Sequence, residues 1–292
     1  MISFKSPKSA TIDEMAATAR RMRAKLVEMS HRAGTAHLAS SLSCVDIVVA
    51  AYYSALRIDP RDPWAADRDR FILSKGHAAT TLYAALAFRS FFPEALLDTY
   101  AEAGGCLSEH PGPRCVPGIE AATGSLGHGL PIGLGMAIAA RIQQRDYRVM
   151  VLLSDGECNE GSVWEAAMFA PAQRLENLVA IVDYNKWQAT DRSEQVMALA
   201  PLAAKWQAFG WSTYELDGHD LPALCRALQN TPDGSGKPVC IIAHTVKGRG
   251  VSFMEDDNNW HYRVPKAEEV AAARRELGQT TDDAKTKGHS RP

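Results

Sequence analysis

The chain has 292 residues, of which 46% are hydrophobic, and this is enough material for one large α/β domain or two small ones. Its formal net charge of −2 gives no electrostatic basis for binding nucleic acid or an anionic membrane. No apolar run approaches the length of a membrane span, and residues 1–7 lack a signal-peptide core. The six cysteines show no CxxC spacing, so we expect reduced thiols and a cytoplasmic protein.

The first half of the chain begins with a helical pattern and ends in a long irregular stretch. The elements predicted there are a helix over 11–30, a loop of small residues over 33–43, a helix over 45–56, a strand over 70–74, a helix ending at Arg89 and a helix over 93–103. Thr11 is placed to cap the first helix ahead of Glu14. Residues 104–128 show no regular pattern, and a loop this long inside a domain is usually functional.

In the second half, apolar strand-like runs alternate with helical patterns. The predicted elements are a helix over 129–142, a strand over 149–153, a helix over 161–169, a strand over 178–182, a helix over 198–209, a strand over 211–216, a helix over 221–228 and a strand over 237–243. This alternation predicts an α/β fold, a doubly wound parallel sheet with helices on both faces. We expect one domain over 1–278 and a polar tail over 279–292.

Polar residues follow two of the predicted strands. Asp155 comes after the strand over 149–153, and Asn185 after the next strand along the chain. Parallel strands end at one edge of a sheet, where α/β folds bind ligands. Carboxylate and amide oxygens suit Mg²⁺ or Ca²⁺, and a helix starting near Gly161 favours a diphosphate. Either residue alone is more often a turn or a strand end, but the pair indicates a metal and diphosphate site.

This pair carries a family resemblance. Asp155-Gly156, followed about thirty residues later by Asn185, is similar to the thiamine diphosphate signature GDG…N, with Ser154 in place of the first glycine. The sequence Asp-Gly-Glu-Cys-Asn-Glu-Gly around it resembles the transketolase branch of that group. The resemblance implies that the side chains of Asp155 and Asn185 and the carbonyl of Trp187 hold Mg²⁺, for which Ca²⁺ or Mn²⁺ can substitute.

The resemblance to transketolases extends over almost the whole chain. Matching motifs are GTAH…SLS at 34–43, DRFILSKGHA at 69–78, HPG at 110–112, TGSLG at 123–127 and the segment 211–220. It implies catalytic roles for His37, His77, His110 and His261. It also implies cofactor contacts for His77, Gly124, Leu126, Asp155, Gly156, Glu160, Asn185 and His261. Glu160 and Glu165 match acidic positions of the family's subunit contact, whereas Ala36, Leu38, Ala39 and His128 depart from the usual residues.

The chain ends after the part that resembles the diphosphate-binding domain. No motif matches the family's pyrimidine domain, which binds the aminopyrimidine and supplies an activating glutamate. The resemblance therefore implies the N-terminal subunit of a split transketolase, active only with a C-terminal subunit in an α₂β₂ heterotetramer. The implied reaction transfers a two-carbon ketol unit from a ketose, usually a sugar phosphate, to an aldehyde, with thiamine diphosphate and Mg²⁺ as cofactors.

Three alternatives stay open at this point. The α subunit of a 2-oxo acid dehydrogenase carries the same signature, although the histidine loops and the match around His77 argue against it. An acyloin- or deoxyxylulose-phosphate-forming synthase is the second. A non-catalytic scaffold that kept the fold is the third, and the intact Asp155, Asn185, His77 and His110 argue against it. The sequence does not indicate which sugars react.

Overall fold

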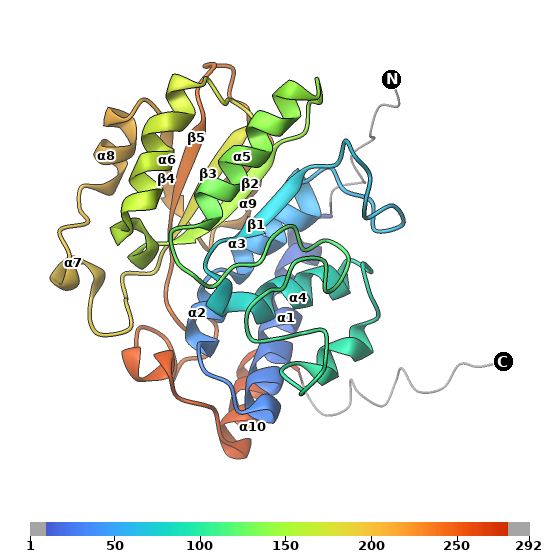
Figure 1. Ribbon diagram of the computed structural model, residues 1–292. Helices are drawn as coiled ribbons and strands as arrows, with labels where there is room; N and C mark the ends of the chain where they lie inside the picture. Colours follow the sequence, from blue (N-terminus) through green and yellow to red (C-terminus); the bar gives the residue numbers. More distant parts are fainter. Residues whose placement is uncertain (1–9, 280–292) are drawn as a thin grey trace.

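A parallel sheet of five strands forms the middle layer of the part of the chain that the structure describes, residues 10–279 (Figure 1). In this computed structural model the strands are β1 (Arg70–Leu73), β2 (Val149–Ser154), β3 (Leu178–Tyr184), β4 (Ser212–Asp217) and β5 (Val239–His244). They stand in the order β1-β2-β3-β5-β4, and all four pairings are parallel. The predicted α/β fold and all five predicted strands are confirmed.

Each face of the sheet carries its own apolar core, because successive residues of a strand point to opposite faces. In β2, Met150 and Leu152 belong to one core, while Val151 and Leu153 belong to the other. Every residue of β2 and β3 is buried. This burial on both faces explains why the two strands read as continuous apolar runs rather than alternating ones.

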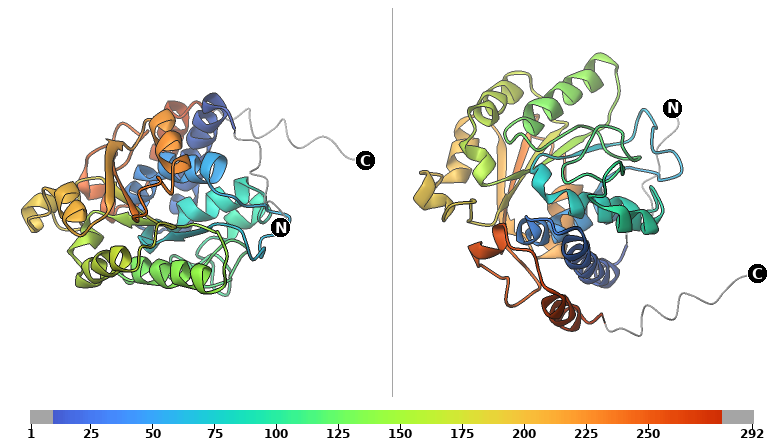
Figure 2. Two further views of the ribbon diagram at one scale, coloured as in Figure 1. Left: turned by 90° about the horizontal axis from the view of Figure 1, so that it is seen from above. Right: turned by 60° about the horizontal axis from the view of Figure 1, so that its bottom comes forward.

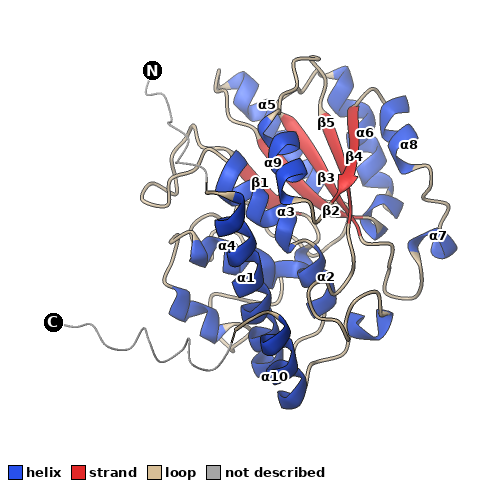
Figure 3. Ribbon diagram, turned by 180° about the vertical axis from the view of Figure 1, so that it is seen from behind, coloured by secondary structure: helices blue, strands red, loops and turns tan. Residues whose placement is uncertain are grey.

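Helices cover both faces, as the doubly wound fold requires. One face is covered by α5 (Gly129–Ile142), α6 (Gly161–Ala172) and α8 (Leu202–Ala208). The other is covered by α1 (Ile12–Ala33), α3 (Val45–Ala50), α4 (Ala79–Phe88) and α9 (Leu221–Gln229). The left view of Figure 2 shows the sheet between the two layers, and Figure 3 shows the second layer from its outer side. Right-handed crossovers decide which face each helix covers. The chain moves across the sheet in one direction as far as β4 and then reverses to reach β5, so α9 lies on the face opposite α8.

The predicted loop over 33–43 is wrong in its second half. Leu38–Ser43 forms the short helix α2, and all six of its residues are buried. Small residues give little helical signal by themselves, so tertiary packing rather than local propensity stabilises this helix. It begins directly after His37, which adopts a left-handed backbone with φ of 67°.

Other helical predictions need smaller corrections. The predicted helix over 45–56 continues beyond α3 as a π turn at Ala51–Ala55. The predicted α-helix over 93–103 is wrong, because Glu94–Thr99 forms a 3-10 helix between Pro93 and Gly104-Gly105, which limit its length. Elements that were not predicted are α7 (Ser193–Val196), α10 (Ala267–Glu276) and 3-10 turns at Gly76–Ala78, Gly156–Asn159 and Asn258–His261.

Two further predictions concern the ends of the chain. The cap of α1 is confirmed, because Thr11 Oγ1 accepts a hydrogen bond from the Glu14 amide at 3.2 Å while the Glu14 carboxylate accepts one from the Thr11 amide at 2.7 Å. The predicted tail over 279–292 lies outside the described residues except for Gln279. No helix within residues 10–279 is long and apolar enough to cross a membrane.

Candidate active site

The carboxyl ends of four strands meet at one edge of the sheet, and polar side chains follow each of them. Lys75 follows β1, Asp155 follows β2, Asn185 follows β3 and Thr245 follows β5. All four are at least 97% buried. The fold therefore brings Asp155 and Asn185 to the same edge, as the βαβ reading of the sequence predicts.

Asp155 is a fully buried carboxylate that pairs with no cation among the described residues. Its Oδ1 accepts a hydrogen bond from the Gly156 amide at 2.9 Å, and its Oδ2 accepts bonds from the Lys186 amide and Ser193 Oγ, both at 2.8 Å. None of the ion pairs formed within residues 10–279 includes Asp155, and burial raises the pKa of this carboxyl to about 6. A buried carboxylate in this situation is stabilised by a bound cation.

Asn185 is buried beside a second carboxylate. Its Nδ2 lies 3.4 Å from Asp183 Oδ2, to which it donates, and its Oδ1 accepts a hydrogen bond from the Trp187 amide at 3.1 Å. Asp183 thus turns the Nδ2 end of the amide toward itself and leaves Oδ1 on the other side. These contacts leave one lone pair of Asn185 Oδ1 without a hydrogen-bond donor.

A buried ion pair between Lys75 and Asp183, which the sequence analysis missed, joins the strand ends. Both side chains are fully buried and in contact, and Ser43 Oγ donates to Asp183 Oδ2 at 2.6 Å. Thr245 Oγ1 donates to the other carboxylate oxygen. Although burial by itself raises the pKa of Asp183, the Lys75 ammonium holds it below its usual value. The sequence did carry a signal, because each is a charged residue at the end of an apolar strand. For Lys75 this signal lay inside the DRFILSKGHA motif, which was matched to the family as a whole.

A third buried carboxylate, Glu157, attaches the start of α5 to the sheet. Its Oε1 accepts hydrogen bonds from Ser74 Oγ and, at 2.8 Å, from the Gly127 amide. Its Oε2 accepts from the Ser154 amide at 3.3 Å. Glu157 therefore fixes the end of the long loop over 104–128 against the ends of β1 and β2.

Three of the predicted histidines form a cluster of rings. The ring centroids of His37 lie 5.3 Å from His77 and 5.0 Å from His261, and those of His77 and His261 are 6.4 Å apart. Burial lowers the pKa of all three, to about 3 for His261. The three imidazoles are consequently neutral at pH 7. They come from the starts of α2 and α4 and from the segment after β5, so only the fold unites them.

Lys247, also missed from the sequence, sets the orientation of His261. Its Nζ lies 2.8 Å from His261 Nδ1 and 2.8 Å from Asn258 Oδ1. Burial lowers the pKa of Lys247 to about 8, so the ammonium form still predominates at pH 7. An ammonium group can only donate, so Nδ1 accepts, and the neutral His261 ring carries its proton on Nε2.

The long loop brings His110 to the same edge. A Cβ atom at Gly124, whose φ is +142°, would lie 2.7 Å from His110 Cδ2, and a Cβ atom at Gly76 would lie 2.6 Å from the backbone of Thr123 and Gly124. The loop therefore rests directly on the end of β1 only because both positions are glycine. His110 is exposed, yet it is close enough to lower the pKa of His37 further.

The remaining predicted residues lie outside the ring cluster. Leu126 is half-buried, and its carbonyl lies 3.1 Å from His128 Nδ1. Glu160 is exposed at the start of α6, and Glu165 is exposed within this helix. His219 and His244 form their contacts elsewhere, His219 Nδ1 with Asp46 Oδ2 and His244 Nε2 with Glu215 Oε2, both at 2.7 Å.

Several buried polar atoms at this edge have no hydrogen-bond partner within the described part of the chain. They are His37 Nδ1, Thr123 Oγ1, Asn159 Oδ1 and Gln188 Nε2. Gln188 lies against Gly156, since a Cβ atom there would be 3.2 Å from Gln188 Cγ. Unpaired buried polar groups are costly, so their accumulation here favours a polar ligand that pairs with them.

Comparison with known proteins identifies the family. Residues 13–286 match the family described as transketolase, thiamine diphosphate binding domain. The chain belongs to the transketolase family. The buried Asp155 without a cation and the unpaired polar atoms beside it fit the diphosphate and ring nitrogens of thiamine diphosphate together with a cation. The match also favours the transketolase interpretation over the dehydrogenase and synthase alternatives.

Individual transketolases show how much of the enzyme this chain covers. One subunit of the apulose-4-phosphate transketolase from Phocaeicola vulgatus is 42% identical over 257 residues, which are 88% of this chain and 91% of that subunit. The 6-deoxy-6-sulfo-D-fructose transketolase subunit SqwG of Clostridium sp. is 41% identical over 222 residues, 76% of this chain and 81% of that subunit. The Campylobacter jejuni transketolase structure superposes with a TM-score of 0.85 at 26% identity, covering 92% of this chain but 43% of that one. The chain thus spans less than half of that solved transketolase.

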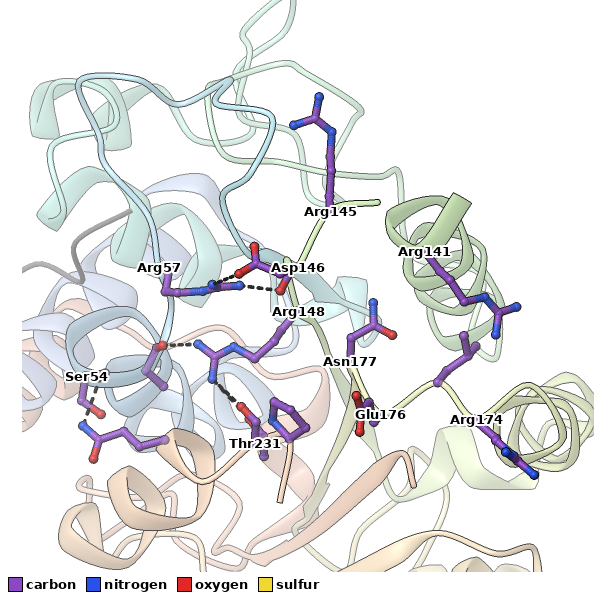
Figure 4. A pocket seen from close by; sticks show the side chains of 14 residues that line it. Ser54, Arg57, Arg141, Arg145, Asp146, Arg148, Arg174, Glu176, Asn177 and Thr231 are labelled. Carbon is purple, nitrogen blue, oxygen red and sulfur yellow. Dashed lines mark hydrogen bonds and ion pairs between the residues drawn. The ribbon is translucent and has the colours of Figure 1, made fainter. Parts of the chain in front are cut away.

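The cavity of about 930 Å³ in Figure 4 lies at the opposite, amino edge of the sheet. Five arginines line it, namely Arg57, Arg141, Arg145, Arg148 and Arg174. Arg57 and Arg148 bind Asp69, and Arg145 pairs with Asp67. Figure 4 shows the Arg141, Arg145 and Arg174 guanidiniums pointing apart rather than toward one ligand. We therefore place the transketolase site at the carboxyl edge.

The histidine cluster predicts how stability depends on pH. Its folded pKa values lie below the 6.5 of a free histidine, so the unfolded chain binds protons first as the pH falls below about 6.5. The stability that the neutral rings contribute is complete above that pH and decreases toward the folded value of His261, about 3. Between pH 7.5 and 5.0, the free energy of urea unfolding should decrease less for His261→Gln than for wild type. Equal losses would contradict this assignment.

Proposed function

We propose that this chain is the N-terminal, thiamine diphosphate-binding subunit of a split transketolase. The observation that carries the proposal is the cluster of neutral histidines beside a buried carboxylate without a cation, at the strand-end edge of a transketolase domain. The reaction is the transfer of a two-carbon ketol unit from a ketose, preferably phosphorylated, to an aldehyde. The partner is a C-terminal subunit with the pyrimidine domain, in an α₂β₂ heterotetramer. The names of the two bacterial relatives support a partner, since both are named as subunits of a transketolase.

The proposed domain covers residues 1–278. Ala273 and Leu277 at the end of α10 belong to the same apolar core as α1, and Arg274 pairs with Glu28 of α1 at 3.1 Å. The chain is therefore packed into one unit through Leu277. All six cysteines are free, which supports a reducing, cytoplasmic location as part of the proposal.

Mg²⁺ is the proposed metal, held by Asp155, Asn185 and the carbonyl of Trp187. Asp155 Oδ2 already accepts two hydrogen bonds, but Oδ1 accepts one, so Oδ1 is the oxygen available for a cation. Asn185 Oδ1 likewise accepts one hydrogen bond. Mg²⁺ completes its octahedron with phosphate oxygens and water, so two side chains and one carbonyl are a suitable protein contribution. Ca²⁺ and Mn²⁺ have the same preference for oxygen and should substitute.

Residues around the metal are proposed to contact the cofactor. The Gly156 backbone and the His77 and His261 rings would contact the diphosphate and thiazolium, while Gly124 and Leu126 would contact the aminopyrimidine. Glu160 is exposed at the start of α6, and it is proposed to contact the cofactor where the partner meets this chain. When bound, thiamine diphosphate supplies the electron sink that allows the ketose C2–C3 bond to break.

The histidines are proposed to hold and move the protons of the sugar hydroxyls. A neutral imidazole donates through one nitrogen and accepts through the other, so each ring can hold a hydroxyl proton from either side. His261 presents Nε2–H as a donor because Lys247 occupies Nδ1. His37 Nδ1 is buried and unpaired among residues 10–279, so it is available to a substrate hydroxyl.

Replacing His110 with alanine should lower kcat by about 100-fold, within the range typical of acid–base groups. His110 lies on the loop beside Gly124 and not among the predicted metal ligands, so the Kd of thiamine diphosphate should change much less. Steady-state kinetics and cofactor titration check this. His244→Ala is the matched control, since that exposed histidine binds Glu215 outside the cluster. If kcat and the donor KM of His110→Ala both equal the wild-type values, His110 is misassigned.

The proposed function is tested by reconstitution. The chain is mixed with a candidate partner that carries a pyrimidine domain, thiamine diphosphate and Mg²⁺. The donor panel contains fructose 6-phosphate, apulose 4-phosphate and 6-deoxy-6-sulfo-D-fructose, the last two because relatives are named for them. Release of the shortened aldose supports ketol transfer, whereas a complex that binds cofactor but transfers nothing would favour a scaffold role.

A further inference from the structure

Tyr262 is an exposed aromatic residue with no role in the proposed site. Its relative exposure is 62%, and it directly follows His261. Its ring centroid lies 4.6 Å from His261 and 5.6 Å from His37, at interplanar angles of 67° and 59°. The ring therefore extends the histidine cluster outward to the surface.

The two histidine contacts leave much of the Tyr262 ring uncovered. Neither histidine stacks flat on it, since both angles are far from parallel. Its hydroxyl forms no hydrogen bond within residues 10–279. The ring therefore offers both an apolar face and a free polar tip to whatever occupies the space beside the histidines.

The backbone holds this ring firmly in place. The His261 carbonyl accepts a hydrogen bond from the His37 amide at 2.9 Å, and Lys247 binds the His261 ring. Trp260 is buried, and its Nε1 donates to the Phe253 carbonyl at 2.9 Å. The backbone that carries Tyr262 therefore needs little further ordering when a ligand binds.

The cluster is also ordered from inside to outside. His77 adjoins the fully buried Lys75 and the strand ends that are proposed to hold the diphosphate. His37 and His261 come next, and Tyr262 is outermost. A ketose with its reacting carbons near His77 would therefore direct the rest of its chain toward Tyr262.

We propose that Tyr262 is a specificity-determining residue whose ring packs against the carbon chain of the ketose donor beyond the two carbons that are transferred. The inference rests on the proposed function and adds a substrate contact to it. Binding sites commonly combine aromatic surface with a few polar groups, and here the histidines supply the polar groups. The C–H groups of a sugar chain are the apolar surface that the ring covers.

The contact predicts a difference between long and short donors. Tyr262→Ala should raise the KM of a five- or six-carbon ketose phosphate about 10-fold with kcat changed less than twofold, the pattern of lost ground-state binding. It should leave the KM of hydroxypyruvate unchanged, because this donor loses only CO₂ beyond the transferred unit. Tyr262→Phe keeps the ring and should resemble wild type. Tyr214→Ala is the control for removing a partly exposed tyrosine elsewhere.

The experiment measures kinetics and binding on the assembled complex of each variant. Kinetics use hydroxypyruvate and the most active ketose phosphate of the panel. Binding uses calorimetry with the alditol phosphates made by reducing fructose 6-phosphate, which lack the keto group and cannot react. A 10-fold weaker alditol affinity for Tyr262→Ala but not Tyr214→Ala supports the contact without depending on turnover.

Three results would overturn the proposal. They are a long-donor KM and alditol Kd within twofold of wild type, an equal loss with hydroxypyruvate, or no alditol binding by the wild-type complex. A wild-type complex that binds alditol phosphate yet transfers no ketol unit would instead reject the proposed function. In that case the alditol affinities still decide whether Tyr262 contacts the sugar chain.

Discussion

Replacing Asp155 with alanine is expected to weaken Mg²⁺-dependent thiamine diphosphate binding by at least about 100-fold while the chain stays folded. The side chain is fully buried, lacks a cationic partner among the described residues and accepts three hydrogen bonds. Its removal leaves no unpaired buried cation, and each of the three donors that lose their acceptor costs about 1–3 kcal/mol. Calorimetric titration of the assembled complex with thiamine diphosphate, with and without Mg²⁺, measures the binding.

Two further variants separate coordination from folding. Asp191→Ala removes an exposed carboxylate from the same segment after β3, and its cofactor affinity should equal that of wild type. Asp155→Asn keeps the shape and an accepting oxygen but removes the charge, so it should also lose most Mg²⁺ dependence. Thermal unfolding of the apo chain reports folding. An unchanged cofactor affinity in Asp155→Ala would remove Asp155 from the metal site.

The sheet was predictable because its signal is local and strong. β2 and β3 are buried along their whole lengths, so their uninterrupted apolar runs are longer than those of a turn or a surface helix. The position of Asp155 and Asn185 at one edge then followed from the parallel arrangement of βαβ strands. The cap of α1 was equally local, since Thr11 and Glu14 lie three residues apart.

Features that depend on distant contacts were not predictable in the same way. α2 is helical because its six small and apolar residues are buried, and the sequence around it reads as a loop. The Lys75–Asp183 ion pair joins the ends of β1 and β3, and neither residue signals the other. The resemblance supplied the four histidines, but not Lys247, whose contact explains which nitrogen of His261 carries the proton. Charged residues directly after buried strands therefore merit inspection in other parallel sheets.

The chain alone is expected to show no ketol transfer above the background of thiamine diphosphate in solution. Residues 10–279 supply groups for the diphosphate and the hydroxyls, and under the proposed function the pyrimidine-binding domain belongs to the partner. Three large apolar side chains on α5 and α6 are also exposed, namely Ile142 at 76%, Met168 at 58% and Phe169 at 47%. α5 follows directly on the loop with Gly124 and Leu126, which are proposed to contact the aminopyrimidine, the part of the cofactor that the partner binds. Exposed apolar residues on neighbouring helices of one layer favour an interface.

The measurement is an activity titration with the partner protein. The purified chain is assayed with thiamine diphosphate, Mg²⁺ and the donor panel while the partner concentration rises, and size-exclusion chromatography follows assembly. We expect turnover to rise from background and saturate at equal concentrations of the two chains, because an obligate interface of about 2,000 Å² or more binds tightly. Met168→Glu, which places a charge on the exposed face of α6, should require more partner for half-maximal activity. An exposed residue on the opposite layer supplies the control, since Gln229→Glu on α9 should titrate like wild type. Robust ketol transfer by the lone polypeptide would overturn the split-subunit assignment, because the pyrimidine-activating group would then have to come from this chain itself.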